Sequence, residues 1–212
     1  MNKAPSSAVI LGAGLGSRFG QRGLLRPKGF IEFGGQPIIE MSILKMRDAG
    51  IGRVLIVTGH LADFYQELAG RYPELVELVH NPRYAESGSM YSLYCAREQI
   101  NDDFWLFESD LVYERKALDE LMSISKGTAL LMSGPTGSKD EVYIEAADGL
   151  LRNMSKQREK LASVAGELVG ICRVSMDCYA QMNVYAEEIL EQTLRLEYEQ
   201  ALVADAKILP VE

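Results

Sequence analysis

The feature that most constrains this chain is a glycine-rich loop placed directly after a short apolar run. The run Ala8-Val9-Ile10-Leu11 is typical of a buried strand, and glycines follow it at positions 12, 14 and 16. Glycine lets the backbone approach a phosphate closely and turn its N–H groups toward it. Arg18 and, ten residues later, Lys28 in Pro27-Lys28 add positive charge. The segment therefore predicts an anion-binding turn that begins at the end of a strand.

Two common phosphate-binding loops do not fit this segment. The third glycine of the dinucleotide fingerprint G-x-G-x-x-G is replaced here by Ser17. A Walker loop requires a Gly-Lys-Ser/Thr that does not follow. The remaining structural alternative is a tight strand-to-helix turn with incidental basic residues.

Apolar runs alternate with helix-type periodicity along the first half of the chain. Strands are predicted at 8–11, 54–57, 75–79 and 104–107, and helices at 37–49, 61–72 and 90–100. Such alternation indicates βαβ units, and hence an α/β fold whose mostly parallel sheet has helices on both faces.

The second half has a different pattern. Strands are predicted at 128–133, 142–146 and 168–174, followed by one long helical region at 176–204. No Pro- or Ser-rich linker separates the halves, so we expect a single domain over 1–212. Its later strands either extend the same sheet or form a small β lid.

Composition narrows the class of protein. The 212 residues are 47% hydrophobic and carry a net charge of −8, which disfavours general binding to nucleic acid or anionic membranes. Three cysteines without a C-x-x-C pair and two isolated histidines predict neither a disulfide framework nor a zinc site. With no run of 18 apolar residues, a cytoplasmic protein is the simple expectation.

Further polar residues sit where a parallel sheet binds ligands. Glu108-Ser109-Asp110 ends a predicted strand, and Asp110 there is suited to Mg²⁺, although it could instead cap the next element. Gly88 and Ser89 precede a helix, either as a plain cap or as ligand-binding groups. Lys156 either belongs to a solvated charged loop or reaches an anionic substrate.

With these residues in view, the chain resembles the sugar-nucleotide-type nucleotidyltransferases, whose opening signature is L-x-x-G-x-G-S/T-R followed by P-K. Within that superfamily it is most similar to the small-headgroup cytidylyltransferases, which act on phosphocholine or 2-aminoethylphosphonate. The matching stretches are Leu11 to Arg18, Pro27-Lys28, Gly88 to Leu93, Glu108 to Leu111, Asp140 to Tyr143, Asn153 to Lys156 and Gly166 to Gly170. The resemblance implies a three-layer α/β/α Rossmann-like nucleotidyltransferase fold with a mostly parallel mixed sheet.

The resemblance also implies site residues and partners. Residues 1–115 would form a nucleotide-binding half and 116–212 an acceptor-binding half. CTP would be bound by Leu11, Gly12, Ala13, Gly14, Gly16, Ser17, Arg18, Lys28, Gly88 and Ser89. The catalytic residues would be Arg18, Lys28, Asp110 and Lys156, with Mg²⁺ on Asp110. The acceptor would contact Lys156, Glu167, Glu197 and Tyr198. Whether the protein forms a homodimer is left open by the resemblance. The family's second acidic metal ligand has no equivalent before Glu212, so either the chain is shortened or another group completes the site.

The choice of acceptor follows from side-chain chemistry. A primary ammonium group needs carboxylates or other acceptors, whereas a quaternary ammonium group prefers an aromatic cage. Acceptors near the expected pocket are Asp140, Glu141, Glu197 and Glu199, and tyrosines that could form a partial cage are Tyr84, Tyr91, Tyr143 and Tyr198. This favours 2-aminoethylphosphonate over phosphocholine. The alternatives are a phosphocholine cytidylyltransferase, a sugar-1-phosphate nucleotidyltransferase and a non-catalytic nucleotide-binding module.

Overall fold

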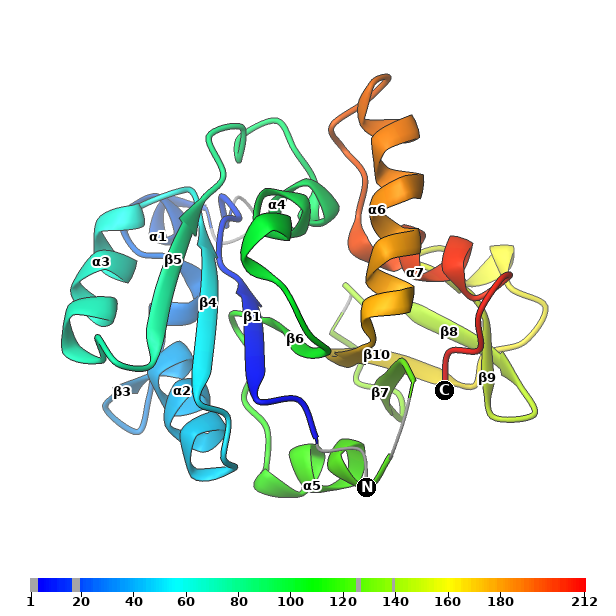
Figure 1. The fold of residues 1–212 in the computed structure, drawn as a ribbon, viewed down its shortest axis with the longest axis horizontal. Helices are drawn as coiled ribbons and strands as arrows, with labels where there is room; N and C mark the ends of the chain where they lie inside the picture. The colour runs from blue at the N-terminus through cyan, green and yellow to red at the C-terminus, as the bar shows by residue number, and fades with distance from the viewer. Residues whose placement is uncertain (1–3, 17–19, 125–126, 139) are drawn as a thin grey trace.

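The centre of the computed structural model is an eight-stranded sheet (Figure 1). The structure describes residues 4–16, 20–124, 127–138 and 140–212. Most of the strands follow the order β5-β4-β1-β6-β10-β8-β9, and β7 also pairs with β10. The first half of the chain supplies the parallel strands, which are β1 (Ser7–Leu11), β4 (Arg53–Thr58), β5 (Val76–His80) and β6 (Phe104–Glu108).

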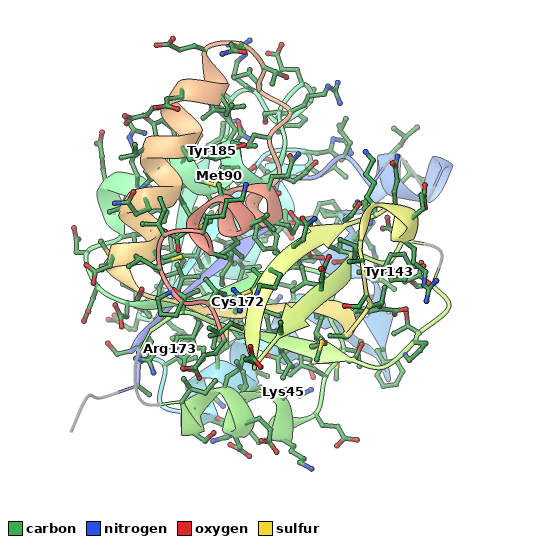
Figure 2. All side chains as sticks on the ribbon, turned by 90° about the vertical axis from the view of Figure 1, so that its right-hand side faces the viewer. Lys45, Met90, Tyr143, Cys172, Arg173 and Tyr185 are labelled. Carbon is green, nitrogen blue, oxygen red and sulfur yellow. The ribbon has the colours of Figure 1, made fainter. Side chains whose placement is uncertain are left out.

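The second half extends this same sheet with antiparallel strands. Strand β10 (Gly166–Val174) pairs with β6 and also with β7 (Ala129–Ser133) and β8 (Tyr143–Ala147). Strand β9 (Leu150–Ser155) pairs with β8 at the edge. Figure 2 looks onto this part of the molecule, with Tyr143 on β8 and Cys172 and Arg173 on β10 labelled. Of the two predicted arrangements, extension of the sheet is the one observed.

Helices cover both faces of the sheet. Successive side chains of a strand point to opposite faces, and in the buried strands both sets are apolar, so each face needs a covering layer. Ile10, Ile56 and Phe107 belong to one core, whereas their neighbours Val9 and Leu55 belong to the other. The first core lies under α2 (Ile38–Asp48), α3 (Ala62–Arg71) and α5 (Arg115–Ser123). The second lies under α4 (Ser89–Cys95), α6 (Met176–Leu190) and α7 (Tyr198–Asp205). The predicted three-layer α/β/α fold with a mostly parallel mixed sheet is confirmed.

Short elements join these layers. They are α1 (Gln21–Leu25), the 3-10 turns η2 (Lys28–Phe30), η3 (Arg97–Gln99) and η4 (Arg158–Lys160), and the hairpin of β2 (Glu32–Phe33) and β3 (Gln36–Pro37). None of the helices in the described part of the chain combines the length and the apolar character required to cross a bilayer.

The prediction of one continuous helix over 176–204 is wrong. Helix α6 ends at Leu190, and residues 191–197 run as an irregular segment before α7 begins at Tyr198. This segment gives backbone carbonyls to the start of α4, because Leu194 accepts from the Gly88 N–H and Leu196 accepts from the Met90 N–H. Strand β9, in the same half, is not predicted from the sequence. Its residues are partly polar, and its pairing with β8 decides the strand conformation.

Candidate active site

A cavity of about 340 Å³ lies at the carboxyl ends of strands β1 and β6. These two strands are adjacent, and Leu11 at the end of β1 pairs with Glu108 at the end of β6. The wall opposite them comes from the second half of the chain, from Asp140, Lys156 and the start of α7. The cavity therefore joins the glycine-rich loop to residues more than 100 positions away, at the edge of the sheet where α/β folds bind ligands.

The glycine-rich loop is fixed by contacts with the unit formed by β4 and α3. The Gly12 N–H donates to the Val57 carbonyl over 2.8 Å, and the Gly12 carbonyl accepts from the Tyr65 hydroxyl, also over 2.8 Å. Gly16 adopts a positive φ of 64°, which favours glycine there. The described part of the loop, up to Gly16, thus has a defined backbone. The predicted nucleotide contacts Ser17 and Arg18 lie outside the described residues.

Lys28 and Asp110 approach each other in the cavity. Lys28 opens the turn η2, and its Nζ lies 3.4 Å from the Asp110 Oδ2. The turn sits close against the end of β6, because a Cβ on Gly29 would lie 2.7 Å from the Ser109 carbonyl oxygen. Both charged side chains are partly exposed to the cavity, at 24% and 30%. The two sequence motifs thus meet in one ion pair beside the glycine-rich loop.

The segment before α7 is tied to the start of α4. The Glu197 Oε2 accepts from the Ser89 N–H over 2.9 Å and from the Ser89 hydroxyl over 2.6 Å, and the Ser89 Oγ accepts from the Tyr198 N–H. A Cβ on Gly88 would lie only 2.2 Å from the Leu196 carbonyl oxygen, so a glycine is required at this close approach. The two predicted halves of the chain therefore contact each other directly at this edge of the cavity.

An acidic wall completes the cavity on the side of α7. The Tyr198 hydroxyl donates to the Glu108 Oε1 over 3.1 Å, and the buried Glu199 Oε2 has no hydrogen-bond partner among the residues that the structure describes. Burial raises the pKa of Glu108, and the nearby charge of Asp110 raises it further. Burial also raises the pKa of Glu199 to about 7, and the neighbouring carboxylates of Glu108 and Glu197 add to this rise.

Lys156 brings a positive charge to the opposite wall. It follows the end of β9, and its Nζ lies 3.5 Å from the Asp140 Oδ1. Its positive charge opposes the rise in the pKa of both Glu108 and Glu199, which places the lysine within electrostatic reach of the acidic wall. The cavity is therefore lined by two lysines, Lys28 near the glycine-rich loop and Lys156 within reach of the acidic wall.

Most of the residues predicted for the site line this cavity. They are Leu11, Gly12, Ala13, Gly14, Gly16, Lys28, Gly88, Ser89, Asp110, Lys156, Glu197 and Tyr198. Glu167 is not among them, and its contact with the acceptor stays a prediction. Its buried carboxylate accepts from the Thr136 N–H over 2.8 Å and from the Thr136 hydroxyl over 2.6 Å, so it stabilises the loop after β7.

Other lining residues escaped the sequence-based selection. Tyr65 lies on an amphipathic helix, where a tyrosine looks like an ordinary core residue. Glu199 was one of several acidic residues near the expected pocket, and only its burial distinguishes it from the others. Glu108 precedes Asp110 by two positions, and the strand period of two predicts both carboxylates on one face, but no role in the site was assigned to Glu108.

A divalent metal fits this site if substrate oxygens share in binding it. In the described part of the chain, no group of three or more His, Cys, Asp or Glu side chains is placed to hold an ion by itself. Mg²⁺ commonly uses one or two carboxylates and completes its shell with phosphates and water. The half-buried carboxylate of Asp110, in the same cavity as the glycine-rich loop, is a donor of this kind.

Comparisons with known proteins point in one direction. The family model described as the MobA-like NTP transferase domain matches residues 8–199. The CMP-5'-(3-aminopropyl)phosphonate synthase of Streptomyces rubellomurinus is 33% identical over 159 residues, covering 74% of this chain and 25% of that protein. The 2-aminoethylphosphonate cytidylyltransferase of Lancefieldella rimae is 35% identical over 112 residues, covering 52% of this chain and 45% of that protein. The chain thus spans between a quarter and a half of the length of these relatives.

Solved structures of nucleotidyltransferases share the fold. The CTP:phosphocholine cytidylyltransferase from Streptococcus pneumoniae superposes with a TM-score of 0.78 at 21% sequence identity. The match covers 97% of this chain and 88% of that one. The architecture described above is therefore the one on which that protein is built.

Proposed function

We propose that this chain, which belongs to the family of MobA-like NTP transferase domains, is a cytidylyltransferase. It transfers CMP from CTP to a small phosphonate or phosphate that also carries an amine, with 2-aminoethylphosphonate preferred, and it releases pyrophosphate. One observation carries the proposal. A single cavity contains the glycine-rich loop, the pair of Lys28 and Asp110, and across from them Lys156 and the buried Glu199.

The nucleotide side of the proposal rests on the loop and on Lys28. Backbone N–H groups of a glycine-rich turn bind phosphate oxygens without the steric hindrance of side chains. Lys28, close to the loop, adds a positive charge in a protein whose net charge is −8. Gly88 and Ser89 line the same cavity, which supports their assignment to the base and ribose.

Asp110 is proposed to hold Mg²⁺ together with phosphate oxygens of the nucleotide. The metal, when bound, neutralises charge on the triphosphate and on the leaving pyrophosphate. Lys28 pairs with Asp110 at 3.4 Å in the absence of substrate and is close enough to turn to a phosphate instead. Two relatives are named for joining CMP to an aminoalkylphosphonate. Their names support the proposal that this cavity binds a nucleotide together with an anionic acceptor.

The reaction needs little acid–base chemistry from the protein. A phosphonate oxygen of the acceptor attacks the α-phosphorus of CTP in line, an O–P bond forms, and the bond from the α-phosphorus to the bridging oxygen of pyrophosphate breaks. The acceptor is already ionised at neutral pH, so a general base is not required. The main tasks are to position two anions and to neutralise their repulsion, for which Lys28 and Lys156 both line the cavity.

The preference for a primary amine rests on Glu199. Its Oε2 is buried at the cavity and lacks a donor in the structure, and such an atom is stabilised by a group that can donate a hydrogen bond. A primary ammonium has three N–H donors, whereas a quaternary ammonium has none. Lys156, within electrostatic reach of Glu199, is suited to the phosphonate at the other end of the same small molecule.

Phosphocholine is the second candidate acceptor, and it is favoured by tyrosines of the cavity wall, among them Tyr84 and Tyr198. Pyrophosphate release with CTP and Mg²⁺ distinguishes the candidates when 2-aminoethylphosphonate and phosphocholine are compared in parallel. We expect faster release with 2-aminoethylphosphonate. Faster release with phosphocholine would overturn the acceptor while keeping the reaction. Binding of CTP without release with either acceptor would indicate a non-catalytic nucleotide-binding module.

We also propose that the enzyme acts in the cytoplasm. All three cysteines, Cys95, Cys172 and Cys178, lie in the described part of the chain as free thiols. Free thiols are typical of a reducing compartment. Fractionation of cells that express the full protein, followed by immunodetection, is the direct measurement.

A further inference from the structure

Tyr65 lies beneath the cavity, and neither the sequence motifs nor the proposed reaction gives it a role. It belongs to α3, it is 1% exposed, and its side chain contributes to the cavity wall. A buried tyrosine normally places its hydroxyl on a hydrogen-bond partner, and the identity of that partner shows what the residue holds in place.

The first segment that Tyr65 contacts is the glycine-rich loop. Its hydroxyl donates to the Gly12 carbonyl over 2.8 Å. A Cβ on Gly12 would lie 2.8 Å from the Tyr65 Cε1 and 2.9 Å from its Oη, so the ring packs directly against the loop backbone. The carbonyl of Gly12 is thereby turned toward α3, and the orientation of this peptide group is fixed.

The second segment is the turn that carries Lys28. The ring of Phe30, at the end of that turn, meets the Tyr65 ring edge to face, with centroids 5.0 Å apart and planes at 88°. This geometry is favoured for aromatic pairs and resists sliding of one ring over the other. The position of the lysine turn is therefore coupled to the same tyrosine.

The third segment is the end of β6. The Ser109 side chain lies near the Tyr65 phenol, because it opposes the rise in the pKa of that phenol that burial causes. Ser109 lies between Glu108 and the proposed metal ligand Asp110. The phenol thus binds the glycine-rich loop and lies near the carboxylate segment, while its ring packs against the lysine turn.

We propose that Tyr65 is a positioning residue that keeps the glycine-rich loop, the Lys28 turn and the Asp110 segment in register for the transfer reaction. The inference rests on the proposed function, because it assigns phosphate binding to those three segments. Tyr65 acts through Gly12, Phe30 and Ser109 and does not itself react. An error of about 1 Å in the placement of reacting groups can cost a factor of about 100 in rate, so a residue of this kind is visible in kinetics.

The chain offers a closely matched control in Tyr179. Its hydroxyl donates to the Leu93 carbonyl over 3.0 Å, it is 1% exposed, and its ring meets Phe104 edge to face at 5.1 Å and 79°. Tyr179 is not among the residues that line the cavity. Tyr65→Phe and Tyr179→Phe therefore each remove one buried hydrogen bond from a tyrosine to a backbone carbonyl and keep the ring packing, but only one of the bonds belongs to the site.

Two measurements separate positioning from a purely structural role. In steady-state pyrophosphate release, Tyr65→Phe is expected to lower kcat by about tenfold to 100-fold and to raise KM for CTP, with KM for the acceptor unchanged. Tyr179→Phe is expected to leave all three constants within about twofold of the original protein. In hydrogen exchange, amides of residues 8–16 are expected to exchange faster in Tyr65→Phe than in Tyr179→Phe. Both variants should lose a similar amount of thermal stability.

Equal kinetics and equal exchange in the two variants would overturn the inference. If the original protein releases no pyrophosphate, the proposed function fails, and the exchange measurement still decides whether Tyr65 holds the loop. If Tyr65→Phe does not fold, Phe30→Leu keeps the phenol and removes the ring through which the lysine turn contacts Tyr65, together with the contact of that ring with Phe64. A kcat that is unchanged in Phe30→Leu would then overturn the inference, and a severalfold decrease would support it.

Discussion

Replacing Glu199 by glutamine tests whether burial in the acidic wall raises the pKa of this carboxyl group. Glu199 is 9% exposed, and its Oε2 has no hydrogen-bond partner in the structure. Burial is the main cause that raises its pKa from 4.5 to about 7, and the carboxylates of Glu108 and Glu197 raise it further, while Lys156 opposes them. Glu199 is therefore largely protonated below pH 7, and its ionisation above that pH costs folding free energy.

The magnitude follows from linkage. A carboxyl group whose pKa is raised in the folded state contributes stability that is fully present below the unfolded pKa of 4.5. That contribution is lost as the pH rises through about 7. At about 1.36 kcal/mol for each pKa unit, the loss between pH 4.5 and pH 8 is about 3 kcal/mol. The glutamine variant does not titrate, so it should be more stable than the original protein at pH 8 and similar to it at pH 5.

Urea unfolding at pH 5 and pH 8, followed by circular dichroism, measures this difference. The control is Glu188→Gln, at an exposed glutamate of α6. We expect the free energy of unfolding to fall between the two pH values by about 3 kcal/mol more in the original protein and in Glu188→Gln than in Glu199→Gln. Glu108 is present in all three proteins, and because its charge contributes to the raised pKa of Glu199, the measured difference includes this coupling. An identical pH dependence in Glu199→Gln and the original protein would show that the folded state does not raise the pKa of Glu199.

Three further outcomes are expected. Lys28→Ala and Asp110→Ala should each nearly abolish pyrophosphate release, and a normal rate in either purified variant would contradict the proposed site. Glu167→Ala should lower the free energy of unfolding by about 1–3 kcal/mol, because removal of the buried carboxylate leaves the N–H and hydroxyl of Thr136 without their acceptor. KM for the acceptor should stay unchanged. Gly88→Ala should lower the free energy of unfolding in urea by about 1–3 kcal/mol, because its Cβ would lie 2.2 Å from the Leu196 carbonyl oxygen; unchanged stability would show that the two segments can separate.

The sequence predicted well where local signals are strong. The run that ends in Leu11, followed by alternate glycines, identified the first strand and its loop, and the buried parallel strands were visible as short apolar runs. Those signals arise from neighbouring residues, which decide backbone conformation and burial together. The fold class follows from the same alternation of strands and helices.

The sequence misled where a distant partner decides the conformation. Residues 191–197 look helical, yet their carbonyls and the Glu197 side chain bind the start of α4, about 100 residues earlier in the chain. Glu167 looked like a residue that could face a ligand, yet it binds Thr136. Hydrogen bonds of this kind join segments that no local pattern connects.

The sequence by itself determined the layered α/β architecture and the place of the glycine-rich loop, Lys28 and Asp110, because glycine conformations, apolar periodicity and charge are properties of short stretches. Only the tertiary structure decided that Tyr65 joins three segments under the cavity and that Glu199, among several similar glutamates, is the buried one. Burial and hydrogen-bond partners depend on which surfaces meet when β10 pairs with β6. That meeting brings the second half of the chain to the loop of the first.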